Sequence, residues 1–403
     1  MTKKLSYRFA GYTEVWEEKK LGETETLFTD GNYGEAYPSE KDLTTSENGV
    51  PFLRGSNLVN GVLDETNANY ITHEKHEELT SGHIELDDII LAVRGSLGAI
   101  GYAKDENVGW NINSQLAIIR TNKNEAKGDF LLQFFISTKG QRELLSRNTG
   151  TALKQLPLKQ LKDIPVPLPS LPEQTAIGSF FQDIDQLISL QQRKLEVLKE
   201  QKKTYLKLLF PAKGQTKPAL RFAGFEDDWK EVKLGEVATI TMGQSPNSEN
   251  YTDNPNDYIL VQGNADMKNG RVFPRVWTTQ ITKQAKQGNL ILSVRAPVGD
   301  IGKTDYDVVL GRGVASIDGN EFLYQVLSQM KQNGYWSKLS TGSTFESINS
   351  NDIKSAIISL PSLPEQEVIG SFFQDLDKAI AKQEEKVNQL KESKQTLLRK
   401  MFI

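Results

Sequence analysis

The sequence LPSLPEQTAIGSFFQDID at residues 168–185 returns almost unchanged as LPSLPEQEVIGSFFQDLD at residues 360–377. The copies differ only at the pairs Thr175/Glu367, Ala176/Val368 and Ile184/Leu376. Chance does not produce a match of this length within one chain, so the stretch marks an internal repeat. Both copies are therefore expected to adopt the same structure.

Each copy carries the signals of a helix start. Ser170 precedes Glu173 by three residues, which is the spacing of a capping box, and Pro172 falls in the first turn, where a missing N–H costs nothing. The second copy has the same residue types at Ser362, Pro364 and Glu365. We therefore predict that two helices begin at equivalent points.

Downstream of each start, apolar residues recur at alternating steps of four and three, which is typical of a coiled-coil seam. The first seam comprises Ile177, Phe181, Ile184, Ile188, Leu195, Leu198, Tyr205 and Leu209. The second comprises Ile369, Phe373, Leu376, Ile380, Val387, Leu390, Leu397 and Met401. At about 1.5 Å per residue, residues 172–209 would form a rod of roughly 57 Å.

Polar residues interrupt both seams at equivalent places, Gln191 and Lys202 in the first and Gln383 and Lys394 in the second. A polar residue in a seam weakens packing but can fix the register of the helices. We interpret the glutamine pair as a register device, with coincidence as the alternative.

The segments before the helices are repeats as well. RFAG at residues 8–11 returns at 221–224, KLGE at 20–23 returns at 233–236, LAVR at 91–94 matches LSVR at 292–295, and TG at 149–150 returns at 341–342. Between these landmarks the two halves share little sequence. The pattern indicates two globular heads with one scaffold and different surfaces.

Apolar runs at residues 89–93 and 289–294 predict strands, and residues 130–145 predict an amphipathic helix. The predicted fold class is α/β (α+β), with two mixed α/β heads separated by an antiparallel coiled coil of two long helices and related by a pseudo-two-fold internal repeat. Two rods of equal length joined through a head most simply pair antiparallel, with the heads at opposite ends.

The predicted domains are a first head at residues 1–167, a first helix at 168–210, a linker and second head at 211–359, and a second helix at 360–403. The linker at 211–218 contains glycine, lysine and two prolines.

The amino-acid composition limits the classes of protein to which this chain can belong. The chain has 403 residues, of which 37% are hydrophobic and 25% charged, and no apolar run is long enough for a membrane span. It has no cysteine, and residues 1–7 show no apolar core of a secretory signal, so a cytoplasmic location is expected. The net charge of −4 argues against a partner held by bulk charge alone, so any contact with nucleic acid must be local.

Some fragments resemble catalytic motifs but do not have the residue spacing that those motifs require. The GKT at 302–304 lacks the first glycine of a phosphate loop, because that position is Pro297. The NPNDY at 254–258 departs from the Asn-Pro-Pro-Tyr motif of amino-methyltransferases, and no glycine-rich loop for S-adenosylmethionine follows any predicted strand.

Charged and histidine clusters also favour a structural interpretation. His73 and His76, with His83, form a weak zinc candidate, and a solvated loop is the favoured interpretation. Glu200 and Lys202 fit the end of a nuclease motif but fall within a predicted rod. We expect neither a catalytic site nor a metal site in this chain.

The doubled Leu-Pro-Glu-Gln helix start at 171–174 and 363–366, the Phe-Phe-Gln-Asp that follows it, the paired Lys-Leu-Gly-Glu and the Thr-Gly turns together resemble the specificity (S) subunit of type I restriction-modification enzymes. The resemblance covers the whole chain. In that family each head is a target recognition domain, the helices are a coiled-coil spacer, and the subunit is not catalytic.

The resemblance implies binding of double-stranded DNA at a bipartite target and docking of two methyltransferase (M) subunits through the helices. It implies no cofactor in this chain. S-adenosylmethionine would bind the M subunit, and ATP and Mg the restriction (R) subunit.

Arginine, asparagine and glutamine read base edges best, so exposed residues of these types in the divergent loops are the DNA-binding candidates. They are Arg54, Asn57, Asn111, Asn113, Arg147, Asn148, Gln244, Asn247, Gln262, Asn264 and Arg312. Arg94 and Arg295 occupy matching positions and are expected to serve phosphate contact or the scaffold. For any single one of these residues, an ordinary surface role is the alternative.

Apolar residues off the seam suggest a second buried face that docks partner helices. They are Phe180, Leu187, Leu206, Phe372 and Leu398. A structural coiled-coil adaptor that joins two proteins without DNA is the competing hypothesis.

Overall fold

The computed structural model describes residues 7–150, 154–339 and 346–402, so the TG repeat at 341–342 lies outside the described residues. The chain divides into two compact units, Met1–Leu190 with Val387–Ile403, and Gln191–Lys386. Each unit combines one head with a part of each long helix. The boundaries predicted from the sequence at residues 167, 210 and 359 remain predictions.

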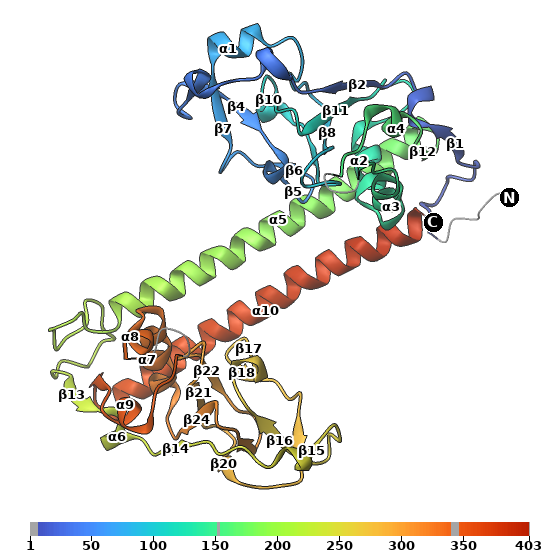
Figure 1. The fold of residues 1–403 in the computed structure, drawn as a ribbon. Coiled ribbons are helices and arrows are strands. Elements are labelled where there is room, and N and C mark those ends of the chain that lie inside the picture. Colours follow the sequence, from blue (N-terminus) through green and yellow to red (C-terminus); the bar gives the residue numbers. More distant parts are fainter. Residues whose placement is uncertain (1–6, 151–153, 340–345, 403) are drawn as a thin grey trace. The chain divides into compact units, whose positions relative to one another are not determined.

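The two long helices are α5, Leu171–Leu208, and α10, Leu363–Met401 (Figure 1). In the first unit, Ile177 and Phe181 near the start of α5 share a core with Leu398 and Met401 near the end of α10. In the second unit, Leu206 and Leu209 pack in one core with Ile369 and Phe373. Within each unit the helices therefore run antiparallel, as predicted, and the seam residues are buried or half-buried.

The polar seam residues bind one another across the helices. In the second unit the Gln383 side chain donates to the side chain of Gln191 at 3.0 Å and to its backbone oxygen at 2.9 Å. The buried Lys394 binds Asp185 at 2.7 Å in the first unit, and Lys202 binds Asp377 at 2.7 Å in the second. These pairs satisfy polar groups only in one alignment, so they favour a single register.

The first head contains two four-stranded sheets, one in the order β10-β4-β7-β3 and one in the order β2-β11-β8-β9. Their strands are β2 Leu27–Asp30, β3 Leu43–Thr44, β4 Gly49–Leu53, β7 Asn69–Thr72, β8 Ile89–Ala92, β9 Ile100–Tyr102, β10 Asn111–Ile112 and β11 Leu116–Arg120. The short hairpin β5 Leu58–Val59 and β6 Val62–Leu63 adjoins β9, and the helices are α1 His73–Glu78, α2 Gly128–Ile136, α3 Thr138–Ser146 and α4 Leu158–Lys162.

The second head contains a six-stranded sheet, β14-β24-β21-β22-β18-β17, and a five-stranded sheet, β15-β19-β16-β23-β20. Their strands are β14 Ile240–Met242, β15 Tyr251–Thr252, β16 Tyr258–Val261, β17 Met267–Lys268, β18 Arg271–Val272, β19 Trp277–Thr278, β20 Lys283–Ala285, β21 Leu290–Ser293, β22 Ile301–Lys303, β23 Val308–Leu310 and β24 Val314–Ile317. Its helices are α6 Leu234–Val237, α7 Glu321–Gln332, α8 Tyr335–Leu339 and α9 Ser350–Lys354.

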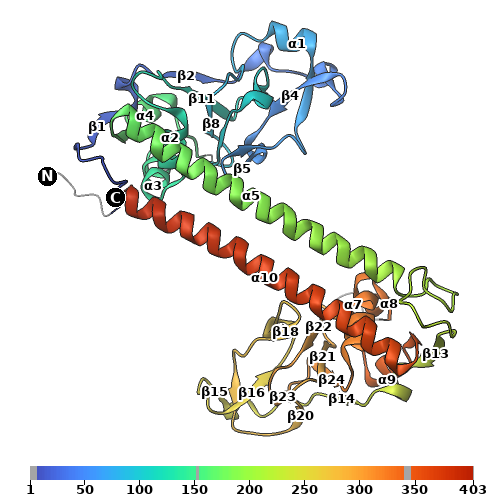
Figure 2. The same ribbon diagram turned by 180° about the vertical axis from the view of Figure 1, so that it is seen from behind.

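Each head is closed by the same antiparallel strand pair directly before a long helix. In the first unit β1 Glu17–Lys20 pairs with β12 Pro165–Leu168, and in the second β13 Lys230–Lys233 pairs with β25 Ile357–Leu360. The predicted strands at 89–93 and 289–294 are β8 and β21. Figure 2 shows α2 beside the start of α5, and α7 beside the start of α10.

The helix predicted for residues 130–145 is wrong in one respect, because it is two helices. The chain turns at Ser137, which has extended backbone angles, and its hydroxyl accepts a hydrogen bond from the Gly140 N–H at 3.1 Å. A serine at this position can cap a new helix, and this local bond competes with continuing the old one.

The glutamates predicted to form capping boxes at the helix starts instead bind an arginine that is distant in the sequence. The Arg8 guanidinium donates to both carboxylate oxygens of Glu173 at 2.6 Å, and Arg221 binds Glu365 in the same way at 2.8 Å. Both carboxylates are buried. Residues 8 and 221 come from the RFAG repeats, so those repeats fasten the beginning of each head to its long helix.

The glutamine of the same motif holds the helix to the body of the head. The side chain of Gln174 accepts from the Lys127 N–H at 2.8 Å and donates to the oxygen of Glu125 at 3.2 Å. In the second unit, Gln366 accepts from the Asn320 side chain at 3.0 Å. The Leu-Pro-Glu-Gln motif therefore joins three segments at one point in each unit.

Replacing the buried carboxylate should destabilise the first unit. Glu173→Gln leaves the Arg8 guanidinium, which is largely buried, without its charge partner, and we expect a loss of about 3 kcal/mol in the free energy of unfolding, measured by urea titration. The exposed Asp183→Asn on the first unit's part of the same helix is the control and should change stability by less than about 0.5 kcal/mol. Equal effects of both changes would contradict this role for Glu173.

Candidate nucleic-acid interface

In the first head, four loops at strand ends converge. They are residues 31–33, 54–57, 94–98 and 113–115, and we call them loop cluster 1. The N–H of Asn113 donates to the oxygen of Leu53 at 2.8 Å, and the N–H of Arg94 donates to the oxygen of Gln115 at 3.1 Å. A Cβ added at Gly31 would lie 2.3 Å from the Asn113 oxygen, so the loops meet at a distance that only glycine permits.

The second head has the corresponding arrangement in residues 243–247, 262–264, 295–299 and 311–313, which we call loop cluster 2. The N–H of Gln244 donates to the oxygen of Leu310 at 2.8 Å, and the N–H of Val294 donates to the oxygen of Gly313 at 2.9 Å. A Cβ at Gly243 would lie 2.0 Å from the Gly311 oxygen. The two heads therefore present equivalent sets of loops on equivalent frames.

The structure brings most of the predicted candidates into these clusters. Six candidates are exposed: Arg54, Arg94, Gln244, Asn247, Arg295 and Arg312. Gln262 is half-buried, and so is Asn264, whose amide donates to Asp300 at 2.9 Å. Contact of any of these residues with DNA remains a prediction.

Arg94 is held in place by three neighbours. Its guanidinium donates to the Ser114 oxygen and to the Gln155 side chain, both at 3.2 Å, and lies 5.0 Å from the centre of the Tyr33 ring. These contacts hold the guanidinium in one position, and the expected role of Arg94 in phosphate contact or in the scaffold remains a prediction. In the second head, the backbone of Arg295 pairs with Ser347.

The prediction that Asn57, Asn111 and Asn113 are exposed and available to bind DNA is wrong, because all three are buried. The Asn57 side chain accepts from the Arg54 N–H at 3.0 Å and donates to the Asp64 oxygen at 2.8 Å. The Asn113 side chain accepts from the Gln115 N–H at 3.0 Å, and the Asn111 side chain contacts His76. Asparagine suits such turns because its amide can replace a missing backbone partner.

Two further candidates are partly withdrawn from solvent. Arg147 is half-buried at the end of α3 and forms an ion pair with Glu143. Asn148 is half-buried as well. Arg147 therefore has a local structural role.

Sequence reasoning missed several residues in and beside the clusters. Tyr33 and Gln155 contact Arg94, Gln115 is exposed beside it, and the Ser245 hydroxyl accepts from the Arg312 N–H at 3.0 Å. For Gln155 the sequence offered one signal, because this residue lies five positions after the first of the two Thr-Gly repeats. The others are brought into the cluster by pairing between distant strands.

The predicted partner-binding face is mostly covered by the chain itself. Leu206 and Leu398 are buried in the cores of their own units, which rules them out as a docking surface. The ring of Phe180 packs against Phe9 with centroids 5.2 Å apart, and Phe372 packs against Phe222 at 5.8 Å. Four of the five off-seam residues are therefore covered, at least in part, within their own units.

Of the five residues predicted to bind a partner, Leu187 is the one that is exposed, with 41% of its surface accessible. Leu190 on the same helix is 64% accessible. These two residues leave a small apolar surface on the first unit's part of α5.

Burial affects ionisable side chains in both heads. Burial raises the pKa of Asp88, although Arg120 binds both of its carboxylate oxygens at 2.7–2.8 Å. Burial also raises the pKa of Tyr324 to about 12. The rings of His76 and His83 lie 4.8 Å apart, but the described residues contain no group of three side chains suited to a metal ion.

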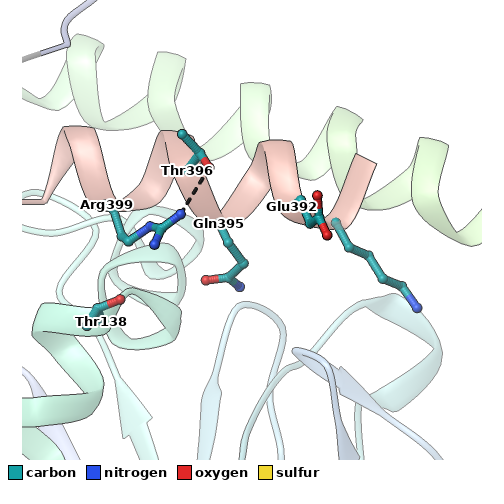
Figure 3. Close-up of a pocket in the computed structure, with 6 residues that line it drawn as sticks. Thr138, Glu392, Gln395, Thr396 and Arg399 are labelled. Atoms are coloured by element: carbon teal, nitrogen blue, oxygen red, sulfur yellow. Dashed lines mark hydrogen bonds between the residues drawn. The ribbon is translucent and has the colours of Figure 1, made fainter. Parts of the chain in front are cut away.

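The pocket in Figure 3 lies between α3 and the end of α10. Glu392, Gln395 and Arg399 project from α10 and Thr138 from α3, with Lys391 completing the lining. Arg399 donates to the Thr396 hydroxyl at 3.1 Å. The pocket combines exposed cations with one carboxylate and pairs no nucleophile with a base, so it supports no catalytic assignment.

Removing a buried cap should lower stability without changing the preferred DNA sequence. Asn57→Ala leaves the Arg54 N–H and the Asp64 oxygen without their partner, so we expect a loss of roughly 2 kcal/mol in a urea titration. The exposed Asn124→Ala in the same head is the control. Unchanged stability combined with a new base preference would restore Asn57 as a reader.

Comparison with known proteins gives a consistent family. A model of the type I restriction modification DNA specificity domain matches residues 13–200 and 226–392. A putative type I restriction enzyme MjaX specificity subunit from Methanocaldococcus jannaschii is 28% identical, with 96% of this chain and 92% of that protein covered. The MjaVIII specificity subunit of the same organism is 24% identical over 77% of each chain.

Two solved structures share the fold. The type I restriction-modification S subunit from M. genitalium has a TM-score of 0.68 at 14% identity, with 100% of this chain and 99% of that chain covered. A chain from a type I R-M system has a TM-score of 0.56 at 23% identity, covering 98% and 99%. The part of the chain that the structure describes contains no helix suited to crossing a membrane. With the repeated heads, the paired helices and the double match to the family model, the chain belongs to the type I restriction-modification specificity subunits.

Proposed function

We propose that this chain reads a bipartite DNA target, with one half-site for each head, and has no catalytic activity of its own. The observation that supports this is the pair of loop clusters, which share a frame but carry different exposed side chains. A common frame with different polar residues suits two readers of different short sequences.

The charge of the clusters fits this role better than the charge of the whole chain. The net charge is −4, yet loop cluster 1 presents Arg54 and Arg94, and loop cluster 2 presents Arg295 and Arg312. Local cations can bind phosphates while the rest of an acidic chain does not. DNA binding at these loops should therefore weaken with added salt.

In the proposed complex, two M subunits dock on the long helices and methylate adenine with S-adenosylmethionine, and R subunits, when present, use ATP and Mg. The exposed Leu187 and Leu190 on α5 belong to the helix surface that supports such docking, since apolar side chains favour a covered position.

Methyl transfer separates the roles of the subunits. The purified chain, incubated with labelled S-adenosylmethionine and a duplex library containing randomised positions, should transfer no methyl group, and the chain coexpressed with an M subunit should do so. Retention of the same library on filters by the chain or its complex tests DNA binding directly. Methylation by the chain alone would contradict the non-catalytic assignment, and protein binding without any retention of DNA would favour an adaptor.

Exchange of one head should change one half of the recognised sequence. Replacing residues 13–167 by the first head of another specificity subunit leaves loop cluster 2 intact, so the second half-site should persist. The measurement is the set of sequences methylated by the assembled complex. The matched control replaces the second head at residues 219–359, and should alter the other half-site. A change of both half-sites in either variant would show that the heads do not read independently.

A further inference from the structure

One position is occupied by different base-reading side chains in the two heads. Strand β4 pairs in parallel with β10, with Leu53 opposite Ile112, and β16 pairs in parallel with β23, with Val261 opposite Leu310. The residue that follows the strand is Arg54 in the first head and Gln262 in the second. The two side chains therefore leave their frames at corresponding points.

One polar side chain holds the turn after this position in each head, and the second head has one residue more between the N–H donor and that side chain. The N–H of Arg54 donates to the Asn57 side chain at 3.0 Å, and the N–H of Gln262 donates to the Asp266 carboxylate at 2.7 Å. Arg54 directly precedes a short 3-10 turn, Gly55–Asn57, whereas Gly263 separates Gln262 from the corresponding turn, Asn264–Asp266.

Each polar side chain that holds this turn is itself fixed. Asn57 donates to the Asp64 oxygen at 2.8 Å, and Asp266 binds Arg275 at 2.9 Å. The side chain that holds the turn is therefore fixed by a further bond in both heads. A rigid support of this kind holds a reading side chain at little entropic cost on binding.

An arginine-bearing loop lies beside this turn in each head. A Cβ at Gly55 would lie 3.1 Å from Ser96, which places the Arg54 turn against the loop that carries Arg94. A Cβ at Gly311 would lie 3.3 Å from the Cγ of Gln262, which places that glutamine beside the loop that carries Arg312. Both turns therefore lie beside an arginine-bearing loop.

The two side chains keep hydrogen-bonding capacity for a partner. One guanidinium nitrogen of the exposed Arg54 donates to the Asn67 oxygen at 3.1 Å, which orients the group and leaves its other donors. Among the described residues, no hydrogen bond takes up the side-chain amide of Gln262. An arginine fork matches the two acceptors of guanine, whereas the donor and acceptor of a glutamine amide match adenine.

We propose that Arg54 and Gln262 are equivalent specificity positions, and that the first head requires guanine and the second adenine at the base pair that each position meets. This inference rests on the proposed DNA-reading function and assigns a base to each reader. The same frame then gives different half-sites by exchanging one side chain.

The test uses the chain assembled with its M subunits and a duplex library with randomised positions, from which methylated sequences are recovered. Arg54→Gln should replace guanine by adenine at one position of one half-site, and Gln262→Arg should replace adenine by guanine at one position of the other. At each position we expect the preference for the original base to fall by about 5- to 150-fold. Thermal unfolding of both variants checks that they are folded.

Two controls separate base reading from charge. Arg54→Lys keeps the charge but loses the planar fork, so it should weaken the guanine preference, whereas Lys104→Gln, an exposed cation of the same head outside loop cluster 1, should leave every preference unchanged. A wild-type complex that recovers no defined sequence would defeat the proposed function itself. A defined wild-type target that Arg54→Gln and Gln262→Arg bind uniformly more weakly, with all base preferences kept, would overturn this inference alone.

Discussion

A buried ion pair at the start of each long helix connects the parts of each unit. Glu173 and Glu365 are withdrawn from water, where an unpaired carboxylate would be costly, and a guanidinium from the RFAG repeat satisfies each of them. The adjacent glutamine bonds the head's own backbone or side chains. The head, the segment that precedes it and the helix therefore meet at one point, and the requirement to satisfy the buried charge fixes their positions within the unit.

Polar groups in the seam between the long helices must also have partners. Gln191 with Gln383, Asp185 with Lys394 and Lys202 with Asp377 are each satisfied across the helix pair. Apolar seam residues would tolerate a shift by one heptad, because one leucine fills a hole much as another does. The polar pairs do not, since a shift would leave a buried amide or ammonium group without a partner.

Glycines and buried amides keep the loop clusters alike while their exposed residues differ. Gly31 and Gly243 allow backbones to meet where a side chain would collide, and Asn57 and Asp266 hold corresponding turns. These residues support a frame without facing solvent. The exposed Arg54 and the half-buried Gln262 occupy positions on that frame that are free to vary, because a change of either side chain disturbs no buried bond.

The sequence by itself determined the internal repeat, the two long helices, their seam and the equivalent polar positions within it, and also the family. These features are periodic or duplicated along the chain, so local patterns carry them. Only the tertiary structure decided that Asn57, Asn111 and Asn113 are buried, that Glu173 binds Arg8 rather than its own helix start, and that Leu206 and Leu398 are covered. The burial of these residues and the contact with Arg8 depend on segments that are distant in the sequence, and no spacing along the chain records which backbone or side chain will lie opposite a given residue once the strands have paired.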